Sequence, residues 1–301
     1  MTPASFSRRG VLVLAGVAAV SLLATFSLGV FGELLAEPPS FGADTFSRSA
    51  LGHRAFVELV KARGRTVLVS RHRTPDRARE GALTALLEPA VGGEDDGRSR
   101  AVLRDVRDAA ARLLVVLPKR SGFPDRLRSS WVGAVRYVPI EEANRVLDAL
   151  SLQATAIRPP ASVGAWEGPL PAPELADPQL VRSEELRPLL SCAEGMLVGE
   201  LRDDRLHLVV LADPDILETH GLGRNAELVM AILGRFDGPP VLVVDETLHG
   251  HEIQPSITRE LLRFPLVLAT LQALVTLGLL AWAAALRFGR PLAPAALLRP
   301  G

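Results

Sequence analysis

Short apolar runs alternate with amphipathic stretches along the middle of the chain. Short runs of about three to five apolar residues lie within residues 66–70, 113–117, 207–211 and 241–245. Between them apolar residues recur at helical spacing, as in the stretch that a serine at 47 or 49 would cap. Apolar strands separated by helices are typical of a parallel sheet covered on both faces. The pattern predicts an α/β domain with a doubly wound, mostly parallel sheet, flavodoxin-like or Rossmann-like.

Two stretches depart from this alternation. Residues 157–179 are rich in proline and lack periodicity, so we expect an extended excursion over the surface. Residues 196–211 predict a hairpin with Asp203 and Asp204 in its turn. The sheet is therefore expected to be mixed, with one antiparallel edge.

Two longer apolar segments flank this domain. Residues 11–32 form an uncharged run of 22 residues, and residues 264–286 form one of 23. As helices, both could cross a hydrocarbon core of about 30 Å, and neither has the polar face of a buried soluble helix. We therefore expect two transmembrane helices. A cleaved signal peptide is the alternative for the first, although its run exceeds the roughly 7–15 apolar residues of such signals.

Basic residues at the two ends predict the orientation of these segments. The tails at residues 1–10 and 287–301 carry arginines and no acidic residue. Positively charged flanks stay in the cytoplasm, so we expect both tails inside and the domain at 33–263 outside. The sequence thus predicts a protein of the cell membrane.

The overall charge and the single cysteine exclude other classes of function. The chain has 34 basic and 34 acidic side chains, whereas nucleic-acid binding needs a basic surface, so we expect no nucleic acid. Cys192 lies in the segment SCAEG, which lacks the G-x-C-x-G elbow of an amidotransferase nucleophile. We interpret it as a small buried residue. Lysine occurs only at Lys61 and Lys119 against 32 arginines, which we attribute to genome composition.

Acidic and imidazole side chains follow two of the predicted strands. If these strands are neighbours, the side chains converge at the carboxyl edge of the sheet, where α/β proteins bind ligands. Asp213, Asp215 and His249 would then be candidates for a divalent cation, although we expect no cofactor. The full set of ligand-binding candidates is Asp213, Asp215, Asn225, Asp245, Glu246 and His249.

The alternative is that these residues only build the local structure, and we favour it. Asp213 precedes Pro214 and would shape the strand-to-helix turn, with Asp215 beside it. The stretch ETHGLGRNAEL reads as a glycine-rich loop, and Asn225 would start the next helix. It has no G-K-[ST], so a phosphate loop is excluded. Ser47, Arg48 and Ser49 at a helix start, with His53 and Arg54, could bind an anionic group, but we favour an ordinary cap with an exposed basic flank.

The order of these motifs resembles a known family. An apolar segment, DTFSRSALGHRAFVELVKARGRTV, VVLADPDILETHGLGRNAELVMAIL, VLVVDETLHG and a second apolar segment follow one another over almost the whole chain. This order is similar to the membrane-anchored proteins of domain of unknown function 4350 (DUF4350). Asp213 to Asp215, Asn225, and Asp245 to Gly250 match the family's motifs. The resemblance implies a degenerate glutamine amidotransferase-like fold without its nucleophile, and it implies no activity.

These observations together predict a class of function. We expect a membrane-anchored, extracytoplasmic interaction or assembly domain that is not catalytic and binds a protein partner or an envelope component. Two alternatives stay open. One is a metal-dependent hydrolase that uses the Asp/His cluster, and the other is an auxiliary subunit of a transport system.

Overall fold

The computed structural model describes most of the middle of the chain. The described ranges are 40–72, 81–92, 96–128, 131–160, 163–236, 241–252 and 266–287, with isolated positions at 17, 20, 21, 24, 25 and 261. Contacts divide the chain into two compact units. Pro38–Gln254 form an α/β unit, and the remaining residues at both ends form the other.

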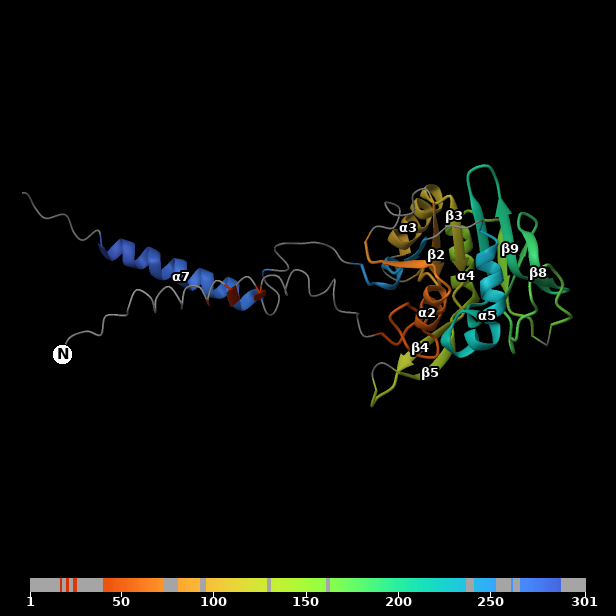
Figure 1. Cartoon of the computed structure of the whole chain (residues 1–301), viewed down its shortest axis with the longest axis horizontal. Coiled ribbons are helices and arrows are strands. Elements are labelled where there is room, and N and C mark those ends of the chain that lie inside the picture. Colours follow the sequence, from red (N-terminus) through yellow and green to blue (C-terminus); the bar gives the residue numbers. More distant parts are fainter. Residues whose placement is uncertain are drawn as a thin grey trace, which may run out of the picture. The chain divides into compact units, whose positions relative to one another are not determined.

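The α/β unit is built on a nine-stranded mixed sheet (Figure 1). Its parallel strands are β1 (Thr66–Ser70), β2 (Ala82–Leu87), β3 (Arg112–Val116), β10 (His207–Leu211) and β11 (Val241–Asp245). Its antiparallel strands are β6 (Ala154–Ile157), β7 (Leu180–Ser183), β8 (Arg187–Cys192) and β9 (Gly195–Arg202). The order is β1-β11-β2-β3-β10-β9-β7-β6, and β8 pairs with β9. The α/β class with a large parallel part is confirmed, although the antiparallel part is larger than one edge.

Helices cover both faces of the sheet, as expected for a doubly wound layer. Helices α2 (Arg54–Ala62) and α5 (Thr219–Gly234) supply one hydrophobic cluster, and α3 (Asp96–Ala109) and α4 (Ile140–Ala149) supply the other. Strand β3 contributes side chains to both clusters, because successive side chains of a strand point to opposite faces of the sheet. Its Leu114 and Val116 belong to the first cluster, and Leu113 and Val115 belong to the second.

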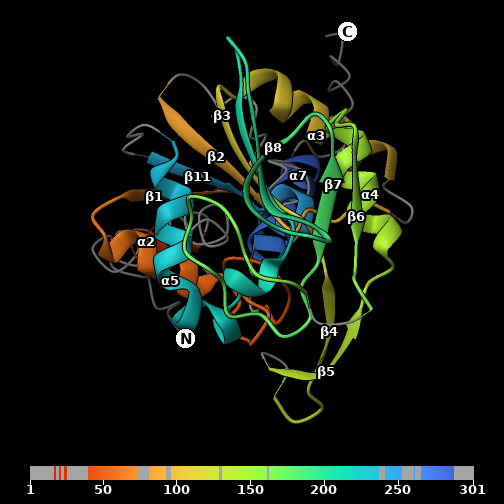
Figure 2. The same cartoon turned by 90° about the vertical axis from the view of Figure 1, so that its right-hand side faces the viewer.

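A separate two-stranded hairpin extends from the main sheet. Strands β4 (Arg120–Pro124) and β5 (Val132–Tyr137) pair antiparallel with each other and not with the central sheet. Both views show the hairpin projecting from the edge of the unit (Figures 1 and 2). The hairpin begins directly after Lys119, so it leaves the unit at the carboxyl end of β3.

The predicted membrane spans find no support in the structure. A helix, α7 (Leu266–Arg287), covers most of the apolar segment at 264–286. Within the part of the chain that the structure describes, however, no helix is long and apolar enough to cross a membrane. The segment at 11–32 lies largely outside the described residues.

Candidate functional site

A buried polar residue marks the carboxyl end of every parallel strand. Ser70 ends β1, Glu246 follows β11, Glu88 follows β2, Lys119 comes shortly after β3, and Asp213 comes shortly after β10. None of the five is more than 4% exposed. The carboxyl ends of parallel strands meet at one edge, where open α/β sheets place their ligands. These five residues and the polar side chains bonded to them are called the carboxyl-edge cluster.

A lysine occupies the space between the two predicted aspartates. Lys119 Nζ lies 2.6 Å from Asp213 Oδ2 and 2.7 Å from Asp215 Oδ2. Arg120 also pairs with Asp215. Burial raises the pKa of Asp213, and the Lys119 ammonium opposes this rise. A buried charge is tolerated only when it is paired, so each of these groups depends on the others.

Asp213 also builds the local backbone. Its Oδ1 accepts a hydrogen bond from Asp215 N at 3.0 Å, which caps the short turn η3 (Pro214–Ile216). Its Oδ2 accepts a further bond from Gln179 N at 2.7 Å. Asp213 therefore shapes the strand-to-helix turn, as its place before Pro214 predicts.

Asn225 does not start a helix, so that prediction is wrong. Helix α5 begins at Thr219, and the expected glycine-rich loop is its first turns. Gly221 is there for close packing, because a Cβ at this position would lie 1.9 Å from Asp215 O. Asn225 instead holds the excursion between β6 and β7: its Oδ1 accepts from Glu174 N at 2.8 Å, and its Nδ2 donates to Gly221 O at 3.0 Å.

Glu88 lies at the centre of the cluster, and the sequence analysis missed it. Its Oε1 lies 3.0 Å from His53 Nε2, and its Oε2 accepts from Lys119 N at 3.3 Å. Its φ of 47° is in the left-handed region, which is uncommon for a residue with a side chain and is often found at functional sites. Burial raises the pKa of Glu88 to about 8, so the carboxyl is largely protonated at neutral pH.

Glu218 is a second buried acid that the sequence analysis missed. Burial, and then the nearby Glu88, raise its pKa to about 8. Among the described residues, neither of its carboxyl oxygens has a hydrogen-bond partner, and neither does His53 Nδ1. His220 Nδ1 lies 3.1 Å from Glu218 Oε2, but its hydrogen bond goes to Ala50 O. Burial lowers the pKa of His53, so Glu218 and His53 both favour their neutral forms.

The residues after β11 form their own linked pairs. Glu246 Oε1 accepts from Thr45 N at 2.8 Å, and Oε2 lies 2.8 Å from His249 Nδ1. Burial lowers the pKa of His249, but the Glu246 carboxylate outweighs this and raises it to about 9. Asp245 caps the turn η4 (Thr247–His249) by accepting from Thr247 N at 3.0 Å. The side chain of His249 is 11% exposed, so it is largely shielded from solvent.

The structure does not bring the predicted metal ligands together. Strands β10 and β11 are not neighbours, because β2 and β3 lie between them. Asp213 and Asp215 are therefore separated from His249, and Lys119 and Glu88 stand between them. Among the described residues, two other groups have potential ligand atoms within 4.8 Å of one another. These are Asp44 with Glu246 and His251, and Asp215 with Glu218 and His220.

The chain belongs to the family described as domain of unknown function (DUF4350), whose model matches residues 45–233. The match includes Glu88, Lys119, Asp213 and Asn225 but ends before Asp245, so it is shorter than the predicted resemblance. Neither the curated proteins nor the solved structures yielded a match. The relationship to an amidotransferase-like fold stays a prediction.

Proposed function

We propose that this chain is a membrane-anchored, extracytoplasmic interaction domain that binds a protein partner or an envelope component and performs no catalysis. The proposal rests on one observation. At the carboxyl edge of the sheet, where a ligand would bind, charged side chains of the protein pair with one another and fill the space. Lys119 lies between Asp213 and Asp215 at hydrogen-bond distance from both, and its side chain is wholly buried. In a metal site, a cation from solvent would take that place.

The chemistry of the other candidates agrees with a binding role. A general acid or base must reach the proton that it transfers, whereas Asp213 is fully buried and already accepts bonds from Lys119, Gln179 and Asp215. Burial raises the pKa of the Cys192 thiol, whereas reactive cysteines have a lowered pKa. The cluster is thus better suited to fixing the loops at this edge than to turning over a substrate.

The proposed anchoring rests on the two apolar segments and on the arginines at both ends. It agrees with the way the chain enters and leaves the α/β unit. Asp44, near its start, lies 3.4 Å from His251 Nε2, near its end, measured from Oδ2. The described residues near the two ends of the unit therefore lie close together.

Cysteine labelling in intact cells tests this topology. In a Cys192→Ser background, Asp204→Cys places a single thiol in the exposed turn between β9 and β10. A membrane-impermeant maleimide should label this thiol in intact cells and should label a cysteine added after Gly301 only after lysis. Labelling of the added cysteine in intact cells, or protection of the cysteine at 204, would contradict the proposal.

A metal-dependent hydrolase is the second candidate, because Asp215, Glu218 and His220 could supply three ligands to one ion. The absence of hydrogen-bond partners at Glu218, within the described residues, favours it. The ion pairs of Asp215 with Lys119 and Arg120 oppose it, because they bring two positive charges to the same position. The two candidates differ in their response to divalent cations.

A further inference from the structure

The β4–β5 hairpin carries most of the exposed large apolar side chains of the α/β unit. Among its described residues, six large hydrophobic side chains are exposed, and only Leu68 lies outside the hairpin. The other five are Phe123, Leu127, Trp131, Val135 and Tyr137. Leu127 is 94% exposed and Trp131 is 58% exposed. A concentration of apolar surface in one small element marks a binding surface.

Arginines accompany these apolar side chains. Arg126 and Arg128 flank Leu127 in the sequence. The Arg128 guanidinium lies 4.6 Å from the centre of the Trp131 ring, and the Arg136 guanidinium lies 4.9 Å from that of Phe123. These cation–π contacts hold positive charge and aromatic surface side by side. Aromatic rings beside arginines are typical of protein surfaces at the membrane–water interface.

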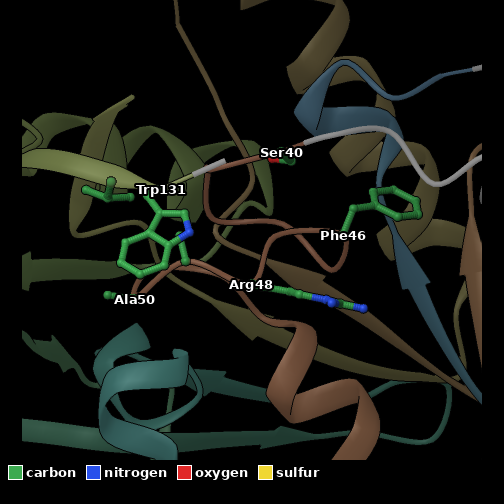
Figure 3. A pocket seen from close by; sticks show the side chains of 7 residues that line it. Ser40, Phe46, Arg48, Ala50 and Trp131 are labelled. Atoms are coloured by element: carbon green, nitrogen blue, oxygen red, sulfur yellow. The ribbon is translucent and has the colours of Figure 1, made fainter. Parts of the chain in front are cut away.

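A pocket of about 550 Å³ lies where the loop end of the hairpin, at Trp131 and Val132, meets residues 40–50. Figure 3 shows Trp131 and Phe46 at its opposite ends, with Ser40 and Arg48 between them. Arg48 is exposed and has no ion-pair or hydrogen-bond partner in the described part of the chain. The pocket thus offers a guanidinium and, at its other end, an indole, which suits a ligand that joins a phosphate or carboxylate to an apolar body.

We propose that the hairpin and this pocket bind the headgroups of anionic phospholipids. Arg48 would contact the headgroup phosphate, Arg126 and Arg128 would face the anionic surface, and Leu127 and Trp131 would enter the interfacial layer. A projecting tip can enter a fluid bilayer without a complementary cavity. A stable protein interface, in contrast, buries about 800 Å² on each partner, which favours a broader surface than this tip.

The position of the hairpin agrees with this inference, which rests on the proposed anchoring. Ser40 lines the pocket and is close to Pro38, where the unit begins. Asp44 is paired with His251, close to Gln254, where the unit ends. The pocket and the described residues nearest to both flanking segments thus belong to one edge of the unit.

Depth-sensitive fluorescence in lipid nanodiscs tests the proposal on the full chain. In a Cys192→Ser background, an environment-sensitive dye is attached to Leu127→Cys. Discs are made of phosphatidylcholine alone or with phosphatidylglycerol. We expect a blue shift of the emission, and quenching by headgroup-attached nitroxides, only in the anionic discs. The same dye on Asp204→Cys, at the opposite edge of the sheet, should not respond.

Substitution of the arginines tests whether their charge recognises the anionic headgroups. Each arginine near an anionic surface strengthens binding by about fivefold, so Arg48→Gln and the pair Arg126→Gln and Arg128→Gln should reduce or remove the shift. An unchanged circular dichroism spectrum controls for folding.

Equal shifts in both lipids, or no shift in a chain that is incorporated into the discs, would overturn the lipid inference and leave the anchoring intact. A shift produced by an acidic peptide but not by phosphatidylglycerol would assign the surface to a protein partner instead. A chain that enters discs of neither lipid would contradict the anchoring, and the inference would fall with it.

Discussion

Lys119 Nζ lies 2.6 Å from Asp213 Oδ2, and both side chains are completely shielded from solvent. The pair joins the carboxyl ends of β3 and β10, which are neighbours in the sheet. It closes the edge where a doubly wound sheet would place a ligand. The account of this protein as a binding domain depends on this closure.

Replacing Lys119 should therefore destabilise the fold strongly. Lys119→Met leaves Asp213 as a buried, unpaired charge, and removing one partner of such a pair costs about 3–5 kcal/mol. Urea denaturation followed by circular dichroism measures this loss. The chain offers a matched control in its other lysine. Lys61 is half exposed on α2, so Lys61→Met should change the stability by about 0.5 kcal/mol or less. Equal effects of the two substitutions would show that the buried pair is not important for the fold.

The stability should fall as the pH rises from about 6.5 to 8. In this range the unfolded chain has released the protons of Glu88 and Glu218, whereas the folded protein keeps them until about pH 8. His249, whose pKa is raised to about 9, acts in the same direction above pH 6.5. Each proton held only by the folded state lowers the stability by about 1.4 kcal/mol per pH unit.

Denaturant unfolding across this pH range checks the prediction. Glu88→Gln and Glu218→Gln remove the titrating groups, so each should flatten the decline. Stability that rises with pH in the wild-type protein, or a slope that both variants leave unchanged, would contradict the protonated state of these two acids.

Two glycines of α5 should respond in opposite directions to alanine. A Cβ on Gly221 would lie 1.9 Å from Asp215 O, so Gly221→Ala must displace the turn that carries Asp215. A Cβ on Gly223 meets nothing within 4 Å. Gly223→Ala should therefore stabilise the helix by about 0.5–1 kcal/mol, whereas Gly221→Ala should destabilise the fold. Thermal unfolding of the two variants measures both signs, and similar shifts for both would refute the packing role of Gly221.

The sequence was sufficient for four of the five parallel strands and insufficient for β2 and for the order of the strands. Continuous apolar runs predicted β1, β3, β10 and β11 because both faces of such strands are covered. The insertion of β11 between β1 and β2 is not visible in the sequence pattern. The convergence of Asp213 with His249 required their strands to be neighbours, and this condition is not met. Asn225 was misplaced because two glycines were interpreted as a loop, although Gly221 lies in a helix for close packing.

The buried residues that the sequence pattern did not predict differ in how far the sequence pointed to them. Lys119 follows a predicted strand in a chain with 32 arginines and two lysines, so the choice of lysine at that place was a signal. The smaller ammonium lies between two buried carboxylates. Glu88 and Glu218 offered no such signal. Their importance comes from their burial beside each other, which depends on contacts between distant parts of the chain.

The response of the full chain to divalent cations tests the closed edge most directly. Thermal unfolding is measured with and without Mg²⁺, Mn²⁺, Ca²⁺ and Zn²⁺ in the wild type, in Glu218→Gln, and in Glu227→Gln as an exposed control on the same helix. Because Lys119 and Arg120 already neutralise Asp215, we predict that no cation changes the midpoint of any of the three proteins. A bound ion at 100 times its Kd would add about 2.7 kcal/mol, a rise of about 5–10 °C. A rise of that size in the wild type and in Glu227→Gln, absent from Glu218→Gln, would show that Asp215, Glu218 and His220 form a metal site and would contradict the account.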